Sequence, residues 1–186
     1  MNRFRERARK AKEQSGNKKI INAEAQTYDG IKFKSKLEVR CYKILKEAGI
    51  PFEYEKIKFV LQKGFYLSDS NVLYYCPKKE KLGNGLEFHA RKFTDITYTP
   101  DFVVTTANTT ILIDVKGYRN DVYLYKLKLL LNMLMKKNDG RRYVFYEPHT
   151  IAQMNGMVED IKGYLKADEQ FNLIQNNILG CPRGNL

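Results

Sequence analysis

The sequence predicts an α/β fold in which helices cover a central mixed β-sheet. Its periodic segments follow the order helix, strand, strand, strand, helix, strand, helix, which is typical of a mixed sheet packed between helices. The 186 residues suit one domain with a sizeable core, and 43% hydrophobic against 29% charged residues is a globular composition. The sequence shows no internal repeat.

The chain is strongly basic, with 33 Lys and Arg against 21 Asp and Glu and a net charge of +12. Such a surplus most often indicates a nucleic-acid partner and less often an acidic membrane surface. Residues 1–19 alone carry eight Lys and Arg and two Glu, or +6. We therefore expect residues 1–27 to form a basic N-terminal arm, either a solvated tail or a non-specific contact to phosphates.

The sequence lacks the signals of membrane proteins, secreted proteins and several enzyme classes. No apolar run approaches the roughly 18 residues of a membrane span, and no apolar stretch follows the basic start, so we expect a cytoplasmic protein. The three cysteines, Cys41, Cys76 and Cys181, show no zinc-binding spacing, and we expect structural or incidental roles for them. Nucleophile-elbow and Walker motifs are absent as well.

The first elements follow a turn at Tyr28–Gly30. Residues 31–33 are expected to be extended, and Ser35 then begins a helix whose apolar residues recur at three- and four-residue intervals. Gly49 is expected to end this helix, with a proline just beyond it. Residues 52–61 alternate between apolar and polar side chains, which predicts a single strand.

Residues 63–95 mix aromatic and basic side chains with helix- and strand-breaking residues, and we interpret them as an inserted hairpin or long loop. These side chains either stack on bases and pair with phosphates or pack beneath a loop. The remaining elements are strands at about 97–105 and 110–116, a helix from 121 that Gly140 ends, a buried strand at 141–147, an amphipathic helix at 149–168 and an unassigned tail from 170.

The segment TYTPDFVVTTANTTILIDVKG, residues 97–117, places charged side chains inside a strand pair. Because alternate side chains of a strand share a face, Val115 and the isoleucines before it point one way, while Asp114 and Lys116 point the other. If the two strands form a hairpin around the turn TANT, Asp101 pairs near the Asp114 end. The sequence therefore predicts two carboxylates and one amine together at one edge of the sheet.

These three side chains fit metal-assisted hydrolysis of a phosphodiester. Two carboxylates at hydrogen-bonding distance repel each other unless they share a cation or a proton. Mg²⁺, for which Mn²⁺ is expected to substitute, takes such ligands, polarises a scissile phosphate and activates a water. Lys116 would stabilise the developing charge. The alternative is an ion pair of Asp114 with Lys116 beside a turn-capping Asp101.

Glu38 allows two interpretations as well. The run Ser35-Lys-Leu-Glu38 has the form of a capping box, in which the Glu38 carboxylate accepts a hydrogen bond from the Ser35 amide. Alternatively, the first turn of this helix faces the metal, and Glu38 supplies a further ligand or orients a water.

Four blocks in order, SKLE, FEYE, YTPDF and IDVKG, resemble the PD-(D/E)XK nuclease superfamily. They are most similar to phage Holliday-junction resolvases of the endonuclease I kind and to related phage nucleases. The resemblance covers residues 33–117, apart from the insertion at 63–95, and continues more loosely through residues 121–146. It implies a restriction-endonuclease-like core over residues 28–169, in which α-helices flank a central mixed β-sheet. If the protein is phage-encoded, its expected location is the cytoplasm of the host cell.

The resemblance also implies an Mg²⁺-dependent endodeoxyribonuclease. Its catalytic acids and lysine would fall on Glu38, Asp101, Asp114 and Lys116, with the three acids as metal ligands. The block FEYE adds Glu53 as a further metal ligand, unless it is an exposed strand carboxylate. One departure is Asp114, since the resolvases usually carry Glu there, which shortens the arm to the metal by one methylene. The insertion has no counterpart in the compact resolvases either.

DNA is the expected partner, branched DNA such as a Holliday junction being favoured, and two symmetric cuts at a junction would require a homodimer. The basic residues expected at the DNA are Lys36, Arg40, Arg91, Lys92, Lys126 and Lys128. Lys126 and Lys128 are explained at least as well as ordinary solvent-exposed lysines that do not contact DNA. Three alternatives stay open: a restriction- or repair-like nuclease, a non-catalytic nucleic-acid-binding protein with a nuclease core, and a basic interaction protein with only an ion pair.

Overall fold

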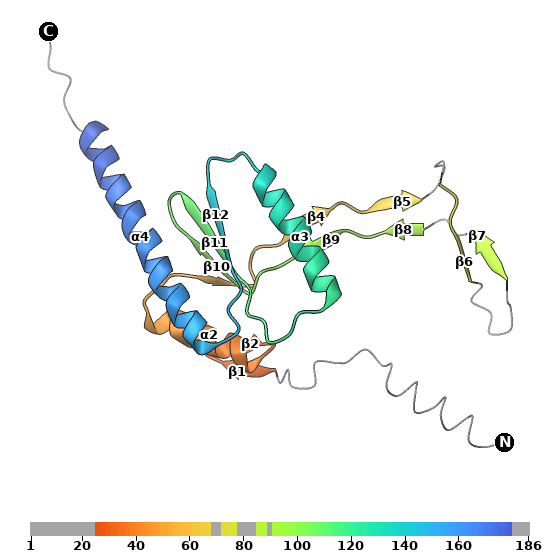
Figure 1. The fold of residues 1–186 in the computed structure, drawn as a ribbon, viewed down its shortest axis with the longest axis horizontal. Coiled ribbons are helices and arrows are strands. Elements are labelled where there is room, and N and C mark those ends of the chain that lie inside the picture. Colours follow the sequence, from red (N-terminus) through yellow and green to blue (C-terminus); the bar gives the residue numbers. More distant parts are fainter. Residues whose placement is uncertain (1–24, 68–71, 78–84, 89–90, 180–186) are drawn as a thin grey trace, which may run out of the picture.

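A mixed four-stranded sheet forms the centre of the protein in a computed structural model that describes residues 25–67, 72–77, 85–88 and 91–179 (Figure 1). In spatial order its strands are β12 (Arg142–Tyr146), β11 (Thr109–Ile113), β10 (Phe102–Thr105) and β3 (Glu53–Tyr54). The β10–β11 and β10–β3 pairs are antiparallel, whereas β11 and β12 run parallel. The α/β class with a mixed sheet is therefore confirmed for the described residues.

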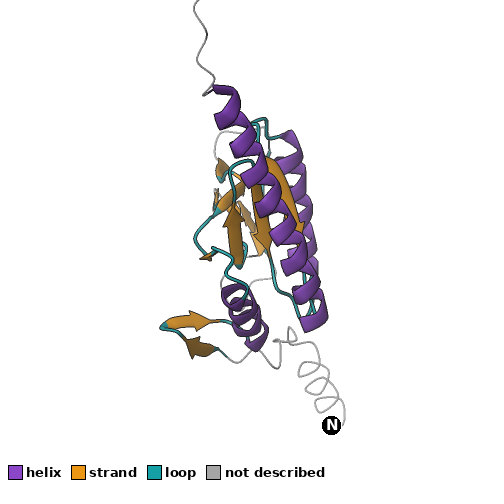
Figure 2. Cartoon of the chain, turned by 90° about the vertical axis from the view of Figure 1, so that its left-hand side faces the viewer, coloured by secondary structure: helices purple, strands orange, loops and turns teal. Residues whose placement is uncertain are grey.

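Helices cover both sides of this sheet because its central strands are apolar on both faces. Phe102 and Val104 of β10 pack with α2 (Lys36–Glu47) and α4 (Ile151–Leu179) on what we call the α2/α4 face. Val103, between them, packs with α3 (Asp121–Lys136) on the α3 face. The predicted alternation of side chains thus divides the core into two layers, and α4 continues beyond the sheet (Figures 1 and 2).

The predicted turn and first helix are confirmed. Strands β1 (Gln26–Tyr28) and β2 (Ile31–Phe33) form a hairpin whose turn residues, Asp29 and Gly30, have φ angles of 54° and 76°. Such left-handed turns match the twist of a two-stranded ribbon. Ser35 caps α2, and its hydroxyl accepts a hydrogen bond of 3.2 Å from the amide of Glu38.

The prediction of one strand over residues 52–61 is wrong, because the chain changes direction at Glu55. This residue has a φ of 46° and its amide donates to the carbonyl of Asp101 (2.9 Å). Strand β4 (Phe59–Gln62) then joins a different partner, β9 (Ile96–Tyr98). The strand predicted at 97–105 is likewise divided, since Pro100 has no amide hydrogen to continue a ladder.

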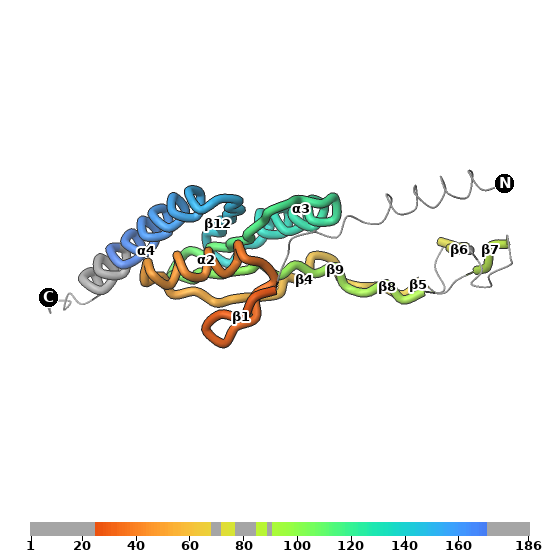
Figure 3. The backbone as a smooth tube through the Cα atoms, turned by 90° about the horizontal axis from the view of Figure 1, so that it is seen from below, coloured from red at the N-terminus to blue at the C-terminus, as the bar shows by residue number. Residues whose placement is uncertain are grey.

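The insertion forms an extended antiparallel hairpin in its described part. Beyond the β4–β9 pair, β5 (Phe65–Leu67) pairs with β8 (Arg91–Phe93), and β6 (Tyr75–Pro77) pairs with β7 (Leu86–Phe88). We call β4, β5, β8 and β9 the ribbon arm, which extends away from the helices (Figure 3). Gly64 is required in it, because a Cβ there would lie 2.4 Å from the carbonyl oxygen of Phe93.

The last predicted helix is correct but too short. Helix α4 continues to Leu179, whereas a tail had been expected from residue 170, and the sequence has no Gly or Pro between Gly163 and Gly180 to end it. The end of α3 was placed late, at Gly140, since the helix ends at Lys136. Most of the predicted N-terminal arm, residues 1–24, and residues 180–186 lie outside the described residues. No helix in the described ranges is long and apolar enough to cross a membrane.

Candidate functional site

The two acids of the predicted cluster lie at the ends of the two central strands. In the β10–β11 hairpin Phe102 pairs with Ile113, so Asp101 and Asp114 occupy the next positions beyond that pair. Strand β11 ends at Ile113, one residue before Asp114 and not at 116 as expected. The Asp114 amide still donates to the carbonyl of Tyr146 (3.0 Å), which keeps the alternation of side chains beyond the strand. The cluster is therefore at a strand end of the sheet and not at an outer strand.

Lys116 connects the two carboxylates. Its Nζ lies 2.9 Å from Oδ1 of Asp114 and 3.9 Å from Oδ2 of Asp101. Asp101 and Asp114 are 5% and 1% exposed, whereas the side chain of Lys116 is 28% exposed. The predicted convergence of two carboxylates and one amine is confirmed, with the amine at the solvent side. The catalytic roles of these residues stay predictions.

Each carboxylate is also oriented by a neutral donor. The amide of Val115 donates to Oδ2 of Asp101 (2.7 Å), and the hydroxyl of Tyr98 donates to Oδ2 of Asp114 (2.5 Å). These hydrogen bonds fix the orientation of both side chains. The orientation of the acids is thus set by the fold before any ligand binds.

Burial changes the protonation of this cluster. Burial, and then the charge of Asp114, raise the pKa of Asp101 to about 8, although Lys116 opposes the shift. Burial alone would lower the pKa of Lys116, but the charges of Asp101 and Asp114 outweigh it and raise that pKa. At neutral pH Asp101 therefore keeps its proton, beside the ion pair of Lys116 with Asp114.

Glu38 acts in the helix cap and also lies beside the cluster. Its carboxylate accepts hydrogen bonds from the Lys34 amide (3.0 Å), the Ser35 hydroxyl (2.9 Å) and the Tyr54 hydroxyl (2.7 Å). The predicted capping box had the Ser35 amide as donor to the Glu38 carboxylate. In the structure the backbone donor is the Lys34 amide instead. Glu38 is 5% exposed, and its charge contributes to the raised pKa of Asp101. A metal-ligand role for Glu38 stays a prediction.

Glu53 lies on β3 and is exposed, and its carboxylate pairs with Lys56 (2.7 Å). The register of β3 against β10 places Glu55, two residues further on, opposite Asp101. Glu55 forms an ion pair with Lys34. Sequence reasoning chose Glu53 and missed Glu55, whose signal was the same FEYE block. The metal-ligand role predicted for Glu53 is untested.

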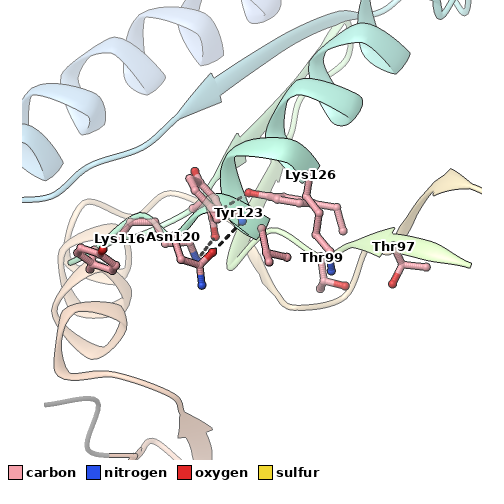
Figure 4. A pocket seen from close by; sticks show the side chains of 10 residues that line it. Thr97, Thr99, Lys116, Asn120, Tyr123 and Lys126 are labelled. Atoms are coloured by element: carbon pink, nitrogen blue, oxygen red, sulfur yellow. Dashed lines mark hydrogen bonds and ion pairs between the residues drawn. The ribbon is translucent and has the colours of Figure 1, made fainter. Parts of the chain in front are cut away.

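A pocket of about 310 Å³ opens beside Asp114 and Lys116 (Figure 4). Its walls come from the β9 end of the ribbon arm and from the first turns of α3. The polar side chains that line it besides the acid and the lysine include Thr97, Thr99, Asn120, Tyr123 and Lys126. Of the basic residues predicted at the DNA, Lys126 is the one that borders this pocket.

Two tyrosines complete the site and were missed by the sequence analysis. Tyr98 bonds to Asp114, and the Lys116 ammonium lies 5.3 Å from the centre of the Tyr123 ring. Burial and then the charge of Asp114 raise the pKa of both tyrosines, so both are protonated. The Tyr123 hydroxyl is buried and finds no hydrogen-bond partner among the described residues. Tyr98 belongs to the block YTPDF, so its place next to the acids could have been found from the sequence. No sequence pattern connects Tyr123 to the site.

The other predicted DNA-binding residues are distributed over two surfaces. Lys36 and Arg40 are exposed on α2, and Lys128 is exposed on α3. Arg91 and Lys92 lie on β8, in the outer part of the ribbon arm. The structure therefore places Lys126 at the pocket and Arg91 and Lys92 away from it.

The donors present fit Mg²⁺ in part. No group of three or more His, Cys, Asp or Glu side chains within the described residues converges as a metal cage. Asp101 and Asp114 nevertheless supply two buried carboxylates, and Mg²⁺ typically binds one or two carboxylates plus waters and substrate phosphate. Since the charge of Asp114 disfavours ionisation of Asp101, a divalent cation bound between them would relieve their repulsion. The cluster fits Mg²⁺ as an open two-carboxylate site.

Cys41 is buried near the site. Among the described residues it forms none of the polar contacts of the site. It is fully buried, and burial, followed by the charges of Asp101 and Glu38, raises its pKa to about 12. A thiol at that pKa is neutral and a poor nucleophile or ligand. Cys76 is also a free thiol, and Cys181 lies outside the described residues.

Comparison with known proteins identifies a family. Residues 18–141 match the model of a family described as protein of unknown function, DUF1064. This range is about two-thirds of the chain and contains Glu38, Asp101, Asp114 and Lys116. No curated protein and no solved structure matches the chain.

Proposed function

This chain belongs to the DUF1064 family of proteins of unknown function, and we propose that it is a divalent-metal-dependent DNA endonuclease with a restriction-endonuclease-like core. The observation that carries the proposal is the cluster of Asp101, Asp114 and Lys116 at the ends of two central strands, of which Asp114 and Lys116 line a pocket. The resemblance of SKLE, FEYE, YTPDF and IDVKG to the PD-(D/E)XK nucleases supports the same activity and contains the same three residues.

Asp101 and Asp114 would hold the metal, with Glu38 next to them. A bound Mg²⁺ or Mn²⁺ would supply Lewis-acid polarisation of the scissile phosphate and a water of lowered pKa. The Val115 amide and the Tyr98 hydroxyl keep the two carboxylates in fixed orientations, so little reorganisation is needed when the substrate arrives.

Lys116 has the position and charge to stabilise a transition state. Its raised pKa keeps it protonated, and its Nζ is the most accessible charged group of the cluster. It lines the same pocket as Lys126, so a phosphate entering there meets two ammonium groups. The charge that accumulates on a phosphate under attack would be stabilised by the nearer one.

Branched DNA is the favoured substrate within this proposal, and the support for it is the sequence resemblance to junction resolvases. The net charge of +12 supports binding to a phosphate backbone of any geometry. A restriction-like or repair-like nuclease would use the same cluster on a different DNA structure. A homodimer is proposed only with junction resolution, because two symmetric cuts require two sites.

A second candidate is a non-catalytic DNA-binding protein. The observation that favours it is the self-sufficiency of the cluster: the 2.9 Å ion pair of Lys116 with Asp114 beside a neutral Asp101 balances charge without a metal. Such a protein would bind DNA tightly and in a salt-dependent manner, but it would not cut any DNA.

The test offers purified protein linear, single-stranded, flap and four-way-junction DNA side by side in the presence of Mg²⁺. We expect metal-dependent cleavage by the wild type and its loss in Lys116→Ala and Asp101→Asn, with folding and DNA binding retained. Lys162→Ala, on α4 at the α2/α4 face, is the matched control and should cleave normally. Unchanged cleavage by either site variant refutes the assignment.

A further inference from the structure

The ribbon arm begins at the candidate site. Tyr98, the last residue of β9, holds Asp114, and its neighbours Thr97 and Thr99 line the pocket. The inner part of the arm is anchored, since Phe59 and Leu61 of β4 pack in the α3-face core. The chain therefore leads directly from the pocket along a supported ribbon to the outer part of the arm, β5 and β8 (Figures 1 and 3).

The outer part exposes aromatic rings next to cations. On one face Phe65 and Phe93 stack with ring centres 4.8 Å apart, and the Arg91 guanidinium lies 5.2 Å from the Phe93 ring centre. On the other face Tyr66, which is 59% exposed, sits opposite Lys92 in the pairing of β5 with β8. The cross-strand stack of Phe65 on Phe93 stabilises the ribbon itself, whereas no aromatic ring of the described residues packs against Tyr66.

Aromatic rings paired with cations are the chemistry that recognises unpaired nucleotides. A free base presents a π-face that stacks on an exposed ring, while the neighbouring phosphate pairs with Arg or Lys. In duplex DNA each base face is already covered by its neighbours, so Tyr66 could stack on nothing. A single strand therefore uses both chemical features of this surface, whereas a duplex uses only the charges.

We propose that β5 and β8 bind unpaired nucleotides of a DNA strand whose continuation enters the pocket beside Asp114 and Lys116. This inference rests on the proposed function and adds to it a substrate feature: a single-stranded segment on one side of the cleaved phosphate. Arg91 is seven residues before Tyr98, which at about 3.3 Å per strand residue gives a reach of roughly 23 Å. At the roughly 3.4 Å per nucleotide of a duplex strand that reach corresponds to at most roughly seven nucleotides, and an extended unpaired strand spans it with fewer.

The test measures binding without divalent metal, by fluorescence anisotropy, on one duplex carrying no tail or single-stranded tails of about 4, 8 and 12 nucleotides. Wild-type affinity should rise roughly tenfold as the tail lengthens to about eight nucleotides and then level off. A fully duplex extension of the same lengths should bring no comparable gain.

Two variants then locate the effect on the arm. Tyr66→Ala should remove most of the gain from the tail, and Arg91→Ala with Lys92→Ala should lower the salt slope on tailed DNA by about 1.4, at about 0.7 per phosphate contact. Tyr66→Ala should bind the untailed duplex as the wild type does, and the double charge variant should lose less affinity for the untailed duplex than for tailed DNA. Lys162→Ala with Lys166→Ala removes the same charge from α4 and should leave the gain from the tail unchanged.

Three results overturn the inference: a wild-type affinity that does not depend on the tail, a stronger gain from duplex than from single-stranded extensions, or arm variants that weaken untailed and tailed DNA equally. Sedimentation of the wild type and Tyr66→Ala adds a fourth, since dissociation of a dimer by this substitution would assign the rings to a second copy of the chain. Failure of the proposed function has a different signature, because tail-dependent binding without metal-dependent cleavage refutes the nuclease while leaving the arm as a binding surface.

Discussion

Replacing Asp101 by Asn should stabilise the metal-free protein, and increasingly so as the pH rises. The pKa of Asp101 is about 8 in the folded protein against an ordinary value of 3.8 for an aspartic acid, chiefly because burial disfavours its charge. Its contribution is therefore favourable at low pH and is lost as the pH rises from about 4 to about 8. Asn keeps the shape and the acceptor for the Val115 amide but has no proton to lose.

The size of the effect follows from that shift. At pH 7 the unfolded chain is about three pH units above the ordinary pKa of Asp101 and has released the proton, whereas the folded protein retains it. Retaining this proton lowers the free energy of unfolding of the wild type by on the order of 4 kcal/mol relative to low pH. The free energy of unfolding of Asp101→Asn minus that of the wild type should grow by roughly 1.4 kcal/mol per pH unit between about pH 5 and 7.

Urea unfolding of both proteins at several pH values, in the presence of a chelator, measures this difference. Asp139→Asn is the control: hydrogen bonds from Lys137 and then Tyr143 lower the pKa of Asp139 to about 2, so that residue does not titrate in the same range. A difference for Asp101→Asn that stays flat with pH would refute the view that burial and Asp114 hold Asp101 in its neutral form.

Two further predictions concern the same acids. Tyr98→Phe removes the hydrogen bond to a carboxylate that is 1% exposed, so it should lower the free energy of unfolding by about 1.5–3 kcal/mol, and an unchanged urea midpoint would contradict that contact. Mg²⁺ or Mn²⁺ should raise the melting temperature of the wild type, equivalent to about 2.7 kcal/mol at a hundredfold excess over Kd, but should not raise that of Asp114→Asn. An equal shift in that variant would place the metal elsewhere.

Local patterns were sufficient for part of the fold and the centre of the site. Ser35 and the spacing of apolar residues after it defined α2, because caps and helical periodicity depend on residues a few positions apart. The same holds for Asp101, Asp114 and Lys116, since a short turn between two alternating strands fixes both the register and the faces of the hairpin. Their convergence was therefore encoded within about twenty residues.

The elements that were not predicted depend on distant partners. The division of residues 52–61 at Glu55 arises because β3 pairs with β10 while β4 pairs with β9, and nothing local distinguishes one long strand from two short ones. The reach of α4 to Leu179 was missed for a different reason, since its last turns carry too weak a periodicity to identify.

The sequence by itself determined which side chains of residues 97–117 share a face, because strand periodicity is a local property. Only the tertiary structure decided the surroundings of that face: Tyr98 arrives through the pairing of β9 with β4, and Tyr123 arrives on a helix that packs across the sheet. Burial in the folded protein raises the pKa of Asp101, and the packing leaves one side of Lys116 open to the pocket. The residues of the candidate site are thus local in sequence, whereas their protonation and access are products of packing.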